Sequence, residues 1–228
     1  MRIACIALFI FVAVSSFSAS AGTNEPFGVA TVPAPDHPLG IHWHKAQGDW
    51  TAERKILDQC RAEREHCPSR EALQFLNIID EARIRTGLAR LAYINRAINL
   101  AIRPMSDLKN YGVFEIWTAP LATLANGAGD CTDYAIAKYF ALGEAGISEN
   151  ERRLVVVGDR RRGGEHAVLA VSEEQHWLIL DNQRMTIVDA IEANQYVSLL
   201  VLDHQGVRQV SGPVQPQMSK YTCVLNGG

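Results

Sequence analysis

Apolar residues in the first half of the chain recur at helical spacing. Between Leu73 and Ile102 they follow one another every three or four residues, and Ser69 stands where a helix N-cap is expected. Gly87 is expected to divide this stretch into two helices, and Pro104 is expected to end the second.

The residues before this stretch are patterned differently. Residues 22–40 are rich in proline and glycine and show little periodicity, so an extended N-terminal arm is predicted over residues 22–48. Asp49 then provides an N-cap for a short helix from Trp50 to Cys60.

The second half of the chain changes from helical to strand patterns. Residues 107–129 are irregular, and a helical stripe then begins at Tyr134 and stops at Gly146. Helices followed by strands predict an α+β fold with an antiparallel sheet. Five apolar runs are predicted to be strands, at 154–157, 167–171, 177–180, 196–202 and 221–225.

The N-terminus has the layout of an export signal. Arg2 precedes an apolar run at residues 3–14, and small residues suited to cleavage follow at 19–21. The run is too short for a membrane span of about 20 residues, although an uncleaved anchor is the alternative. The predicted division is 1–21 as a signal peptide, 22–48 as the arm and 49–228 as one domain outside the cytoplasm.

Composition limits the class of protein. The chain has 228 residues, a formal net charge of -3 and 47% hydrophobic residues, which suits an ordinary globular domain and excludes a disordered chain. Because basic residues are not in excess, no nucleic acid partner is expected. We expect a monomer.

Export to an oxidising compartment changes how the cysteines are interpreted. Cys60 and Cys67 lie close together and are expected to form a disulfide. Cys131 and Cys223 remain, and they form either a second bridge or two thiols. We expect Cys223 to be a buried free thiol.

Cys131 has the surroundings of a nucleophile. It follows the glycine-rich segment 126–130 and precedes a helix, so its thiol feels the positive end of the helix dipole, which favours the thiolate. Backbone amides at a helix start can also stabilise an oxyanion. Gly129 leaves room for a substrate chain to approach the sulfur.

A cysteine nucleophile needs a base, and His166 is the candidate. It stands at the head of the strand at 167–171, and Asp181 ends the strand at 177–180. If the two strands pair antiparallel, the carboxylate lies beside the imidazole and can fix its tautomer. Taken singly, the three residues are commoner as a small buried hydrophobe, a structural histidine and a turn residue. Their joint placement favours a Cys-His-Asp triad.

Four stretches of sequence occur in an order typical of one protein family. They are WTAP at 117–120, GDCTDYAIAKY at 129–139, DRRRGGEHAVL at 159–169 and LDN at 180–182. Together with Cys60 and Cys67 they resemble the bacterial transglutaminase-like cysteine proteinases, the LapG-type periplasmic enzymes. The resemblance covers roughly residues 50–202.

The resemblance implies a papain-like or transglutaminase-like fold whose nucleophile begins a central helix. It implies a triad of Cys131, His166 and Asp181 in a periplasmic endopeptidase with a role in biofilms. Its expected partners are a protein substrate such as a surface adhesin and an inner-membrane regulatory receptor. Candidate residues of the substrate cleft are Trp117, Gly129 and Gly164, although Trp117 is equally suited to core packing.

The resemblance also raises the question of calcium. In the family, acidic residues beside the cysteine bind calcium, and the motif has Glu where this chain has Thr132. Asp130 and Asp133 remain as candidate ligands, but a hard cation gains from every carboxylate. We therefore expect weak calcium binding or none, with Asp130 capping the helix instead. No other cofactor is expected.

Two alternatives to a peptidase stay open. An acyl group on Cys131 can be passed to an amine, as in a transglutaminase, and the scaffold can also serve a non-catalytic binding protein. The run Arg160 to Arg162 offers charge for an acidic substrate or partner, although such a run is more often a solvated loop. His42 and His44 are a weak metal signal, because no cysteine or carboxylate accompanies them.

Overall fold

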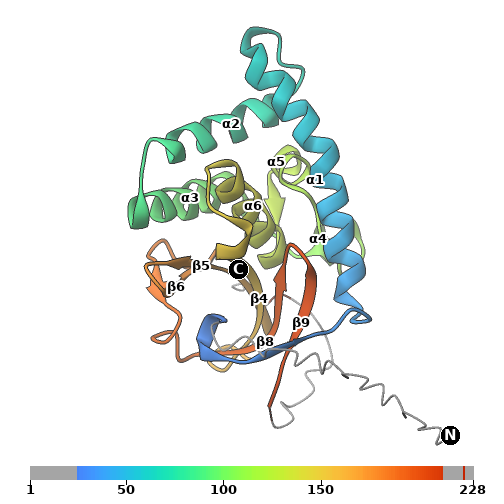
Figure 1. Cartoon of the computed structure of the whole chain (residues 1–228). Coiled ribbons are helices and arrows are strands. Elements are labelled where there is room, and N and C mark those ends of the chain that lie inside the picture. The colour runs from blue at the N-terminus through green and yellow to red at the C-terminus, as the bar shows by residue number, and fades with distance from the viewer. Residues whose placement is uncertain (1–24, 213–222, 224–228) are drawn as a thin grey trace, which may run out of the picture.

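The structure, a computed structural model, describes residues 25–212 and Cys223. The helices gather on one side of an antiparallel sheet, and all strands of this sheet except one near the N-terminus come after the helices in the chain (Figure 1). No helix among the described residues is both long and apolar enough to cross a membrane. The helices are α1 (Leu39–Ala62), α2 (Arg70–Arg83), α3 (Gly87–Ala101), α4 (Asp107–Tyr111), α5 (Pro120–Asn126) and α6 (Cys131–Glu144), with 3-10 turns η1 (Pro26–Gly28), η2 (Arg64–His66) and η3 (Glu149–Glu151).

Within the described part of the chain, the main sheet has seven strands in the spatial order β1-β9-β8-β4-β5-β6-β7, and every neighbouring pair is antiparallel. The predicted α+β class is therefore confirmed. A short parallel pair, β2 and β3, stands apart from this sheet. The strands are β1 (Thr31–Pro33), β2 (Arg103–Pro104), β3 (Ala128–Gly129), β4 (Arg152–Asp159), β5 (Glu165–Glu173), β6 (His176–Leu180), β7 (Val188–Asp189), β8 (Tyr196–Asp203) and β9 (Gly206–Val210).

Most of the predicted elements are confirmed. The helices expected on either side of Gly87 are α2 and α3, and the Ser69 hydroxyl caps α2 by accepting a hydrogen bond from the Ala72 N–H at 3.0 Å. Four predicted strands correspond to β4, β5, β6 and β8. The fifth, at 221–225, lies outside the described residues except for Cys223. The stretch expected to be irregular contains the short helices α4 and α5.

The predicted N-terminal arm is wrong in two respects. Helix α1 begins at Leu39 and runs through Asp49, which pairs with Lys45 on the helix surface instead of capping. Trp43 and Trp50, two helical turns apart, are both buried, so core packing extends the helix upstream. Residues of the predicted arm also form β1, which joins the sheet beside β9. The predicted signal peptide lies outside the described residues.

Strands β4 and β5 are buried on both faces, which explains their unbroken apolar sequences. In β4, Leu154 and Val156 face the helices, whereas Val155 and Val157 contribute to a smaller apolar cluster on the opposite face. Helix α6 lies in the larger cluster, with every residue from Cys131 to Leu142 buried. This central position places the start of α6 against the start of β5.

Candidate active site

Cys131 is the first residue of α6, and the local sequence explains why the helix starts there. Asp130 is the N-cap: its Oδ1 accepts hydrogen bonds from the N–H groups of Thr132 (2.9 Å) and Asp133 (3.3 Å). The Asp133 carboxylate accepts the Asp130 N–H in return, at 3.2 Å. The predicted cap is therefore confirmed. Among the described residues, the Cys131 N–H has no hydrogen-bond acceptor, which leaves it free to bind an oxyanion.

His166 and Asp181 meet because β5 and β6 form a tight hairpin. Their register sets Leu169 opposite Leu180, so the start of β5 lies near the residue that follows β6. His166 Nε2 is 2.9 Å from Asp181 Oδ1, and both side chains are buried. The antiparallel pairing expected from the sequence is thus present, and it brings the imidazole and the carboxylate together.

Hydrogen bonds keep the Asp181 carboxylate ionised in spite of its burial. Burial by itself raises the pKa of Asp181, but the hydrogen bond and charge of His166, the Tyr196 hydroxyl and the Gln183 N–H outweigh it and hold the pKa well below the usual range. The Tyr196 hydroxyl, from β8, donates to Oδ2 at 2.6 Å. Asn99 holds the backbone by donating to the Asp181 carbonyl at 2.9 Å. A fixed, ionised acceptor is what orients an imidazole.

The second ring nitrogen of His166 is the one available for proton transfer. Nδ1 is buried and has no hydrogen-bond partner among the described residues. In the neutral imidazole, a proton on Nε2 directed at Asp181 leaves Nδ1 as the acceptor. The sulfur of Cys131 is held at the same end of β5, where it accepts the N–H of Ala167 at 3.1 Å.

The described cysteines form two disulfides. Cys60 and Cys67 are bonded as predicted. Cys131 is bonded to Cys223, so the expected free thiol at Cys223 is wrong, and the bridge alternative is the one that the structure contains. Cys223 is only half-buried, and its backbone forms a parallel β-bridge with Glu165. The sequence separation of 92 residues gave no sign of this proximity.

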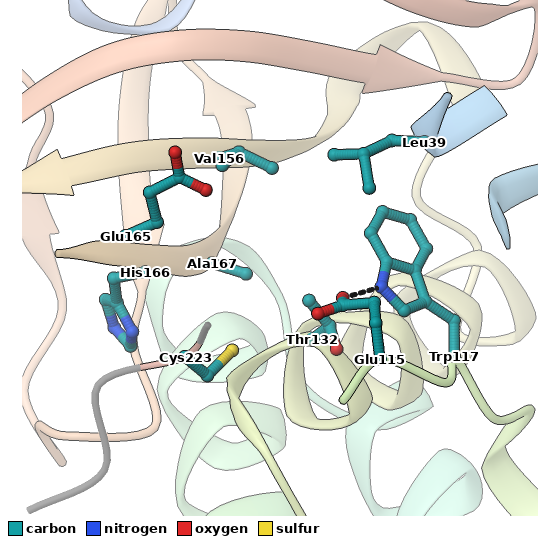
Figure 2. Close-up of a pocket in the computed structure, with 9 residues that line it drawn as sticks. All are labelled: Leu39, Glu115, Trp117, Thr132, Val156, Glu165, His166, Ala167 and Cys223. Atoms are coloured by element: carbon teal, nitrogen blue, oxygen red, sulfur yellow. Dashed lines mark hydrogen bonds between the residues drawn. The ribbon is translucent and has the colours of Figure 1, made fainter. Parts of the chain in front are cut away.

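A cavity lies beside His166 (Figure 2). In this view the Cys223 side chain is drawn between those of His166 and Thr132. Trp117 forms part of the wall, and its indole N–H donates to Glu115 at 2.5 Å. Nine of the described residues line the cavity: Leu39, Glu115, Trp117, Thr132, Val156, Glu165, His166, Ala167 and Cys223.

Two glycines predicted for the substrate cleft have other contacts than this cavity in the structure. Neither Gly129 nor Gly164 lines the cavity. A Cβ on Gly129 would lie 2.7 Å from a carboxylate oxygen of Asp133, so this glycine makes room for the capping carboxylate. Gly164 has φ +87° and forms the turn that leads into β5.

Two acidic residues of the cavity, Glu115 and Glu165, were not among the site residues predicted from the sequence. Burial raises the pKa of Glu115 to about 7, and it also raises the pKa of Glu165 to about 7. One oxygen of Glu165 has no hydrogen-bond partner among the described residues. Both carboxyl groups therefore titrate near neutral pH in the cavity that His166 also lines.

Three buried carboxylates gather at the start of α6. Ligand oxygens of Asp107, Asp130 and Asp133 lie within 4.8 Å of one another. Burial raises the pKa of all three, repulsion by Asp130 adds to the effect on the other two, and the pKa of Asp107 reaches about 7. Oδ1 of Asp107 has no partner among the described residues. This charge and the unused oxygen suit a hard divalent cation.

Asp107 supplies a carboxylate that was not counted when weak calcium binding was expected from Thr132. The Thr132 hydroxyl donates to Asp130 Oδ1 at 2.6 Å and so supports the cap. Asp107, which the sequence did not indicate, supplies a third carboxylate from a different helix. His42 and His44 belong to no cluster of potential metal ligands among the described residues.

The arginine run is exposed. Arg161 and Arg162 lie in the turn between β4 and β5, and together with Arg184 they line a hollow that also includes Tyr196. The N–H groups of Arg161 and Arg162 donate to Asp159 Oδ1, which fixes the turn.

Comparisons with known proteins identify the fold and the family. Solved structures of Legionella pneumophila LapG share the fold: one, 22% identical, covers 68% of this chain and 86% of that chain at a TM-score of 0.57. The calcium-bound form is 21% identical over 74% and 94% of the two chains (TM-score 0.57), and the EGTA-treated form is 20% identical over 74% and 92% (TM-score 0.58). No curated protein matches the sequence. The model of the family described as "Bacterial transglutaminase-like cysteine proteinase BTLCP" matches residues 53–205. Because this match spans more than half of the chain, the protein belongs to the bacterial transglutaminase-like cysteine proteinases and is a cysteine peptidase.

Proposed function

We propose that this peptidase cleaves proteins through a triad of Cys131 as nucleophile, His166 as general base and Asp181 as orienting acid. The observation that carries the proposal is the hydrogen bond between His166 Nε2 and Asp181, which leaves Nδ1 for the thiol. The contact of the Cys131 sulfur with the N–H of the residue after His166 supports the same assignment.

In the reduced enzyme, His166 Nδ1 takes the proton of the Cys131 thiol, and the thiolate attacks the carbonyl carbon of the scissile peptide. The resulting oxyanion is stabilised by the free Cys131 N–H and by the N-terminus of α6. His166 then gives its proton to the leaving amine, and an acyl-enzyme remains. A water molecule, deprotonated by His166, releases the new carboxyl end and restores the thiol. Asp181 stabilises the imidazolium throughout.

Membership of a peptidase family favours water over an amine as the acyl acceptor. Acyl transfer as in a transglutaminase uses the same intermediate and stays the second candidate. The ordered His166–Asp181 pair is an argument against a non-catalytic binding protein, because buried groups with strongly shifted pKa values cluster at functional sites.

We further propose a periplasmic location and a large exported protein, such as a surface adhesin, as the substrate. The predicted export signal and the two disulfides support a compartment that is oxidising. An inner-membrane receptor is the proposed regulatory partner. These assignments rest on the sequence motifs of the family and not on the site geometry.

We infer that calcium binds to Asp107, Asp130 and Asp133. The support is their burial, their mutual proximity and the unpaired oxygen of Asp107. A solved structure of the similar LapG is described as calcium-bound. A bound cation would neutralise carboxylates that otherwise disfavour the thiolate at the start of α6.

The test uses the mature chain after reduction with dithiothreitol, mixed with denatured bacterial surface proteins. Mass spectrometry then identifies newly formed N-termini. We expect the wild type to produce a defined set and both Cys131→Ala and His166→Ala to produce none, because the thiolate and its base perform the chemistry. The same set from Cys131→Ala would remove the assignment. An added primary amine that becomes attached to the new C-termini would favour acyl transfer.

A further inference from the structure

The proposed nucleophile is bonded to a second cysteine in this structure. Cys131 has 1% of its surface exposed, and its sulfur is joined to that of Cys223. A sulfur in a disulfide carries no thiolate, so it cannot attack a peptide carbonyl. The other disulfide, between Cys60 and Cys67, involves none of the proposed catalytic residues. It links the end of α1 to the residue after η2.

The start of β5 has one edge open to a further strand. Asp159 on β4 donates its N–H to the Gly164 carbonyl, so backbone groups of alternate residues from Gly164 onward face β4. Those of Glu165 and Ala167 therefore face the opposite edge. Among the described residues, β6 leaves this edge unpaired, because its pairing with β5 begins only at Leu169.

Cys223 occupies this open edge. Its backbone pairs in parallel with Glu165, and its sulfur reaches Cys131. An extended peptide adds to an open sheet edge through the same backbone groups. A substrate whose carbonyl carbon is to meet the Cys131 sulfur has to pass this edge, beside His166 and in the cavity that Cys223 now lines.

We propose that Cys223 is a covalent latch, which holds the substrate position closed in the oxidised protein and is released by a dithiol reductant. The inference rests on the triad proposed above. It also accounts for the unpaired Nδ1 of His166, because the group that Nδ1 would serve, the Cys131 thiol, is absent while the bridge is intact.

The exposure of the two sulfurs decides the direction of the exchange. Cys131 is buried and Cys223 is half-buried, so a thiolate of the reductant attacks the Cys223 sulfur. The Cys131–Cys223 bond breaks, and Cys131 leaves as a thiolate favoured by the N-terminus of α6. The second thiol of the reductant then attacks the mixed disulfide and frees Cys223. One protein disulfide is reduced and one dithiol is oxidised, with two electrons and two protons transferred.

The experiment uses the mature chain isolated from an oxidising compartment without reductant. Proteolytic digestion and mass spectrometry should yield a cross-linked peptide that contains Cys131 and Cys223. Labelling of Cys131 by biotin-iodoacetamide should rise on the order of tenfold or more after dithiothreitol. Cys223→Ser should be labelled without reductant as fully as the reduced wild type. The matched control, Cys60→Ser with Cys67→Ser, should still require the reductant.

The outcomes separate the latch from the peptidase mechanism. A missing cross-linked peptide, or full labelling of wild-type Cys131 without reductant, overturns the latch whatever the activity. If Cys223→Ser is labelled readily but generates no new N-termini from surface proteins, the latch stands and the catalytic role of Cys131 fails. New N-termini that appear with Cys223→Ser without reductant, and with the wild type only after reduction, support both.

Discussion

Lys138 on α6 offers a quantitative test of the electrostatics around the site. Its side chain is completely buried, and its ammonium makes no hydrogen bond among the described residues. The nitrogen lies 5.8 Å from the centre of the Tyr134 ring. Burial lowers the pKa of Lys138 from 10.5 to about 7, although attraction to Asp181 opposes the change. We predict that Lys138→Met stabilises the folded protein at neutral pH.

The magnitude follows from the two pKa values. The difference between 10.5 in the unfolded chain and about 7 in the folded protein corresponds to about 5 kcal/mol, at about 1.4 kcal/mol per pH unit. Because the folded state holds this proton less tightly, the cost is complete below about pH 7 and vanishes above the unfolded value. Between these limits the wild type should gain about 1.4 kcal/mol per pH unit relative to Lys138→Met.

Urea unfolding at several pH values between about 7 and 9 measures this difference. The slope against pH is the diagnostic quantity, because a change in packing caused by methionine shifts all points equally. Lys45→Met, on the exposed surface of α1, is the matched control for the substitution itself. If the free energies of unfolding of wild type and Lys138→Met differ by a constant amount over this range, Lys138 keeps its proton on folding and the reasoning from burial is refuted.

Two further predictions concern the triad and the acidic cluster. Tyr196→Phe removes the 2.6 Å hydrogen bond to Asp181, so kcat of the reduced enzyme should fall by about tenfold, which corresponds to about 1.4 kcal/mol, with KM unchanged. A kcat equal to that of the wild type would mean that His166 and the Gln183 N–H are enough to hold the carboxylate. Asp107→Asn should weaken calcium binding in calorimetric titration by at least about tenfold, because ligand charge sets calcium affinity. Equal affinities of the two proteins would place the ion elsewhere. No binding to the wild type would favour the expectation from Thr132 that calcium binds weakly or not at all.

Local sequence determined several parts of this protein. Apolar spacing located α2, α3 and the central strands, because burial of one face imposes a period that the sequence must carry. The Asp130 cap that places Cys131 at the start of α6 depends only on residues within one turn. His166 and Asp181 could be paired because they flank a single hairpin, and Cys60 and Cys67 because only a short loop separates them.

Tertiary packing decided the rest. Helix α1 starts at Leu39 because Trp43 packs on Tyr139 and Phe140 of α6, at centroid distances of 5.2 and 6.1 Å, and such a distant partner leaves no local signal. The packing of the helices and the order of the strands also place residues at the site that are far apart in the sequence. Their distance along the chain does not show that they are in contact. In this way Tyr196 contacts Asp181 of the triad, Asp107 joins Asp130 and Asp133, and Cys223 bonds to Cys131.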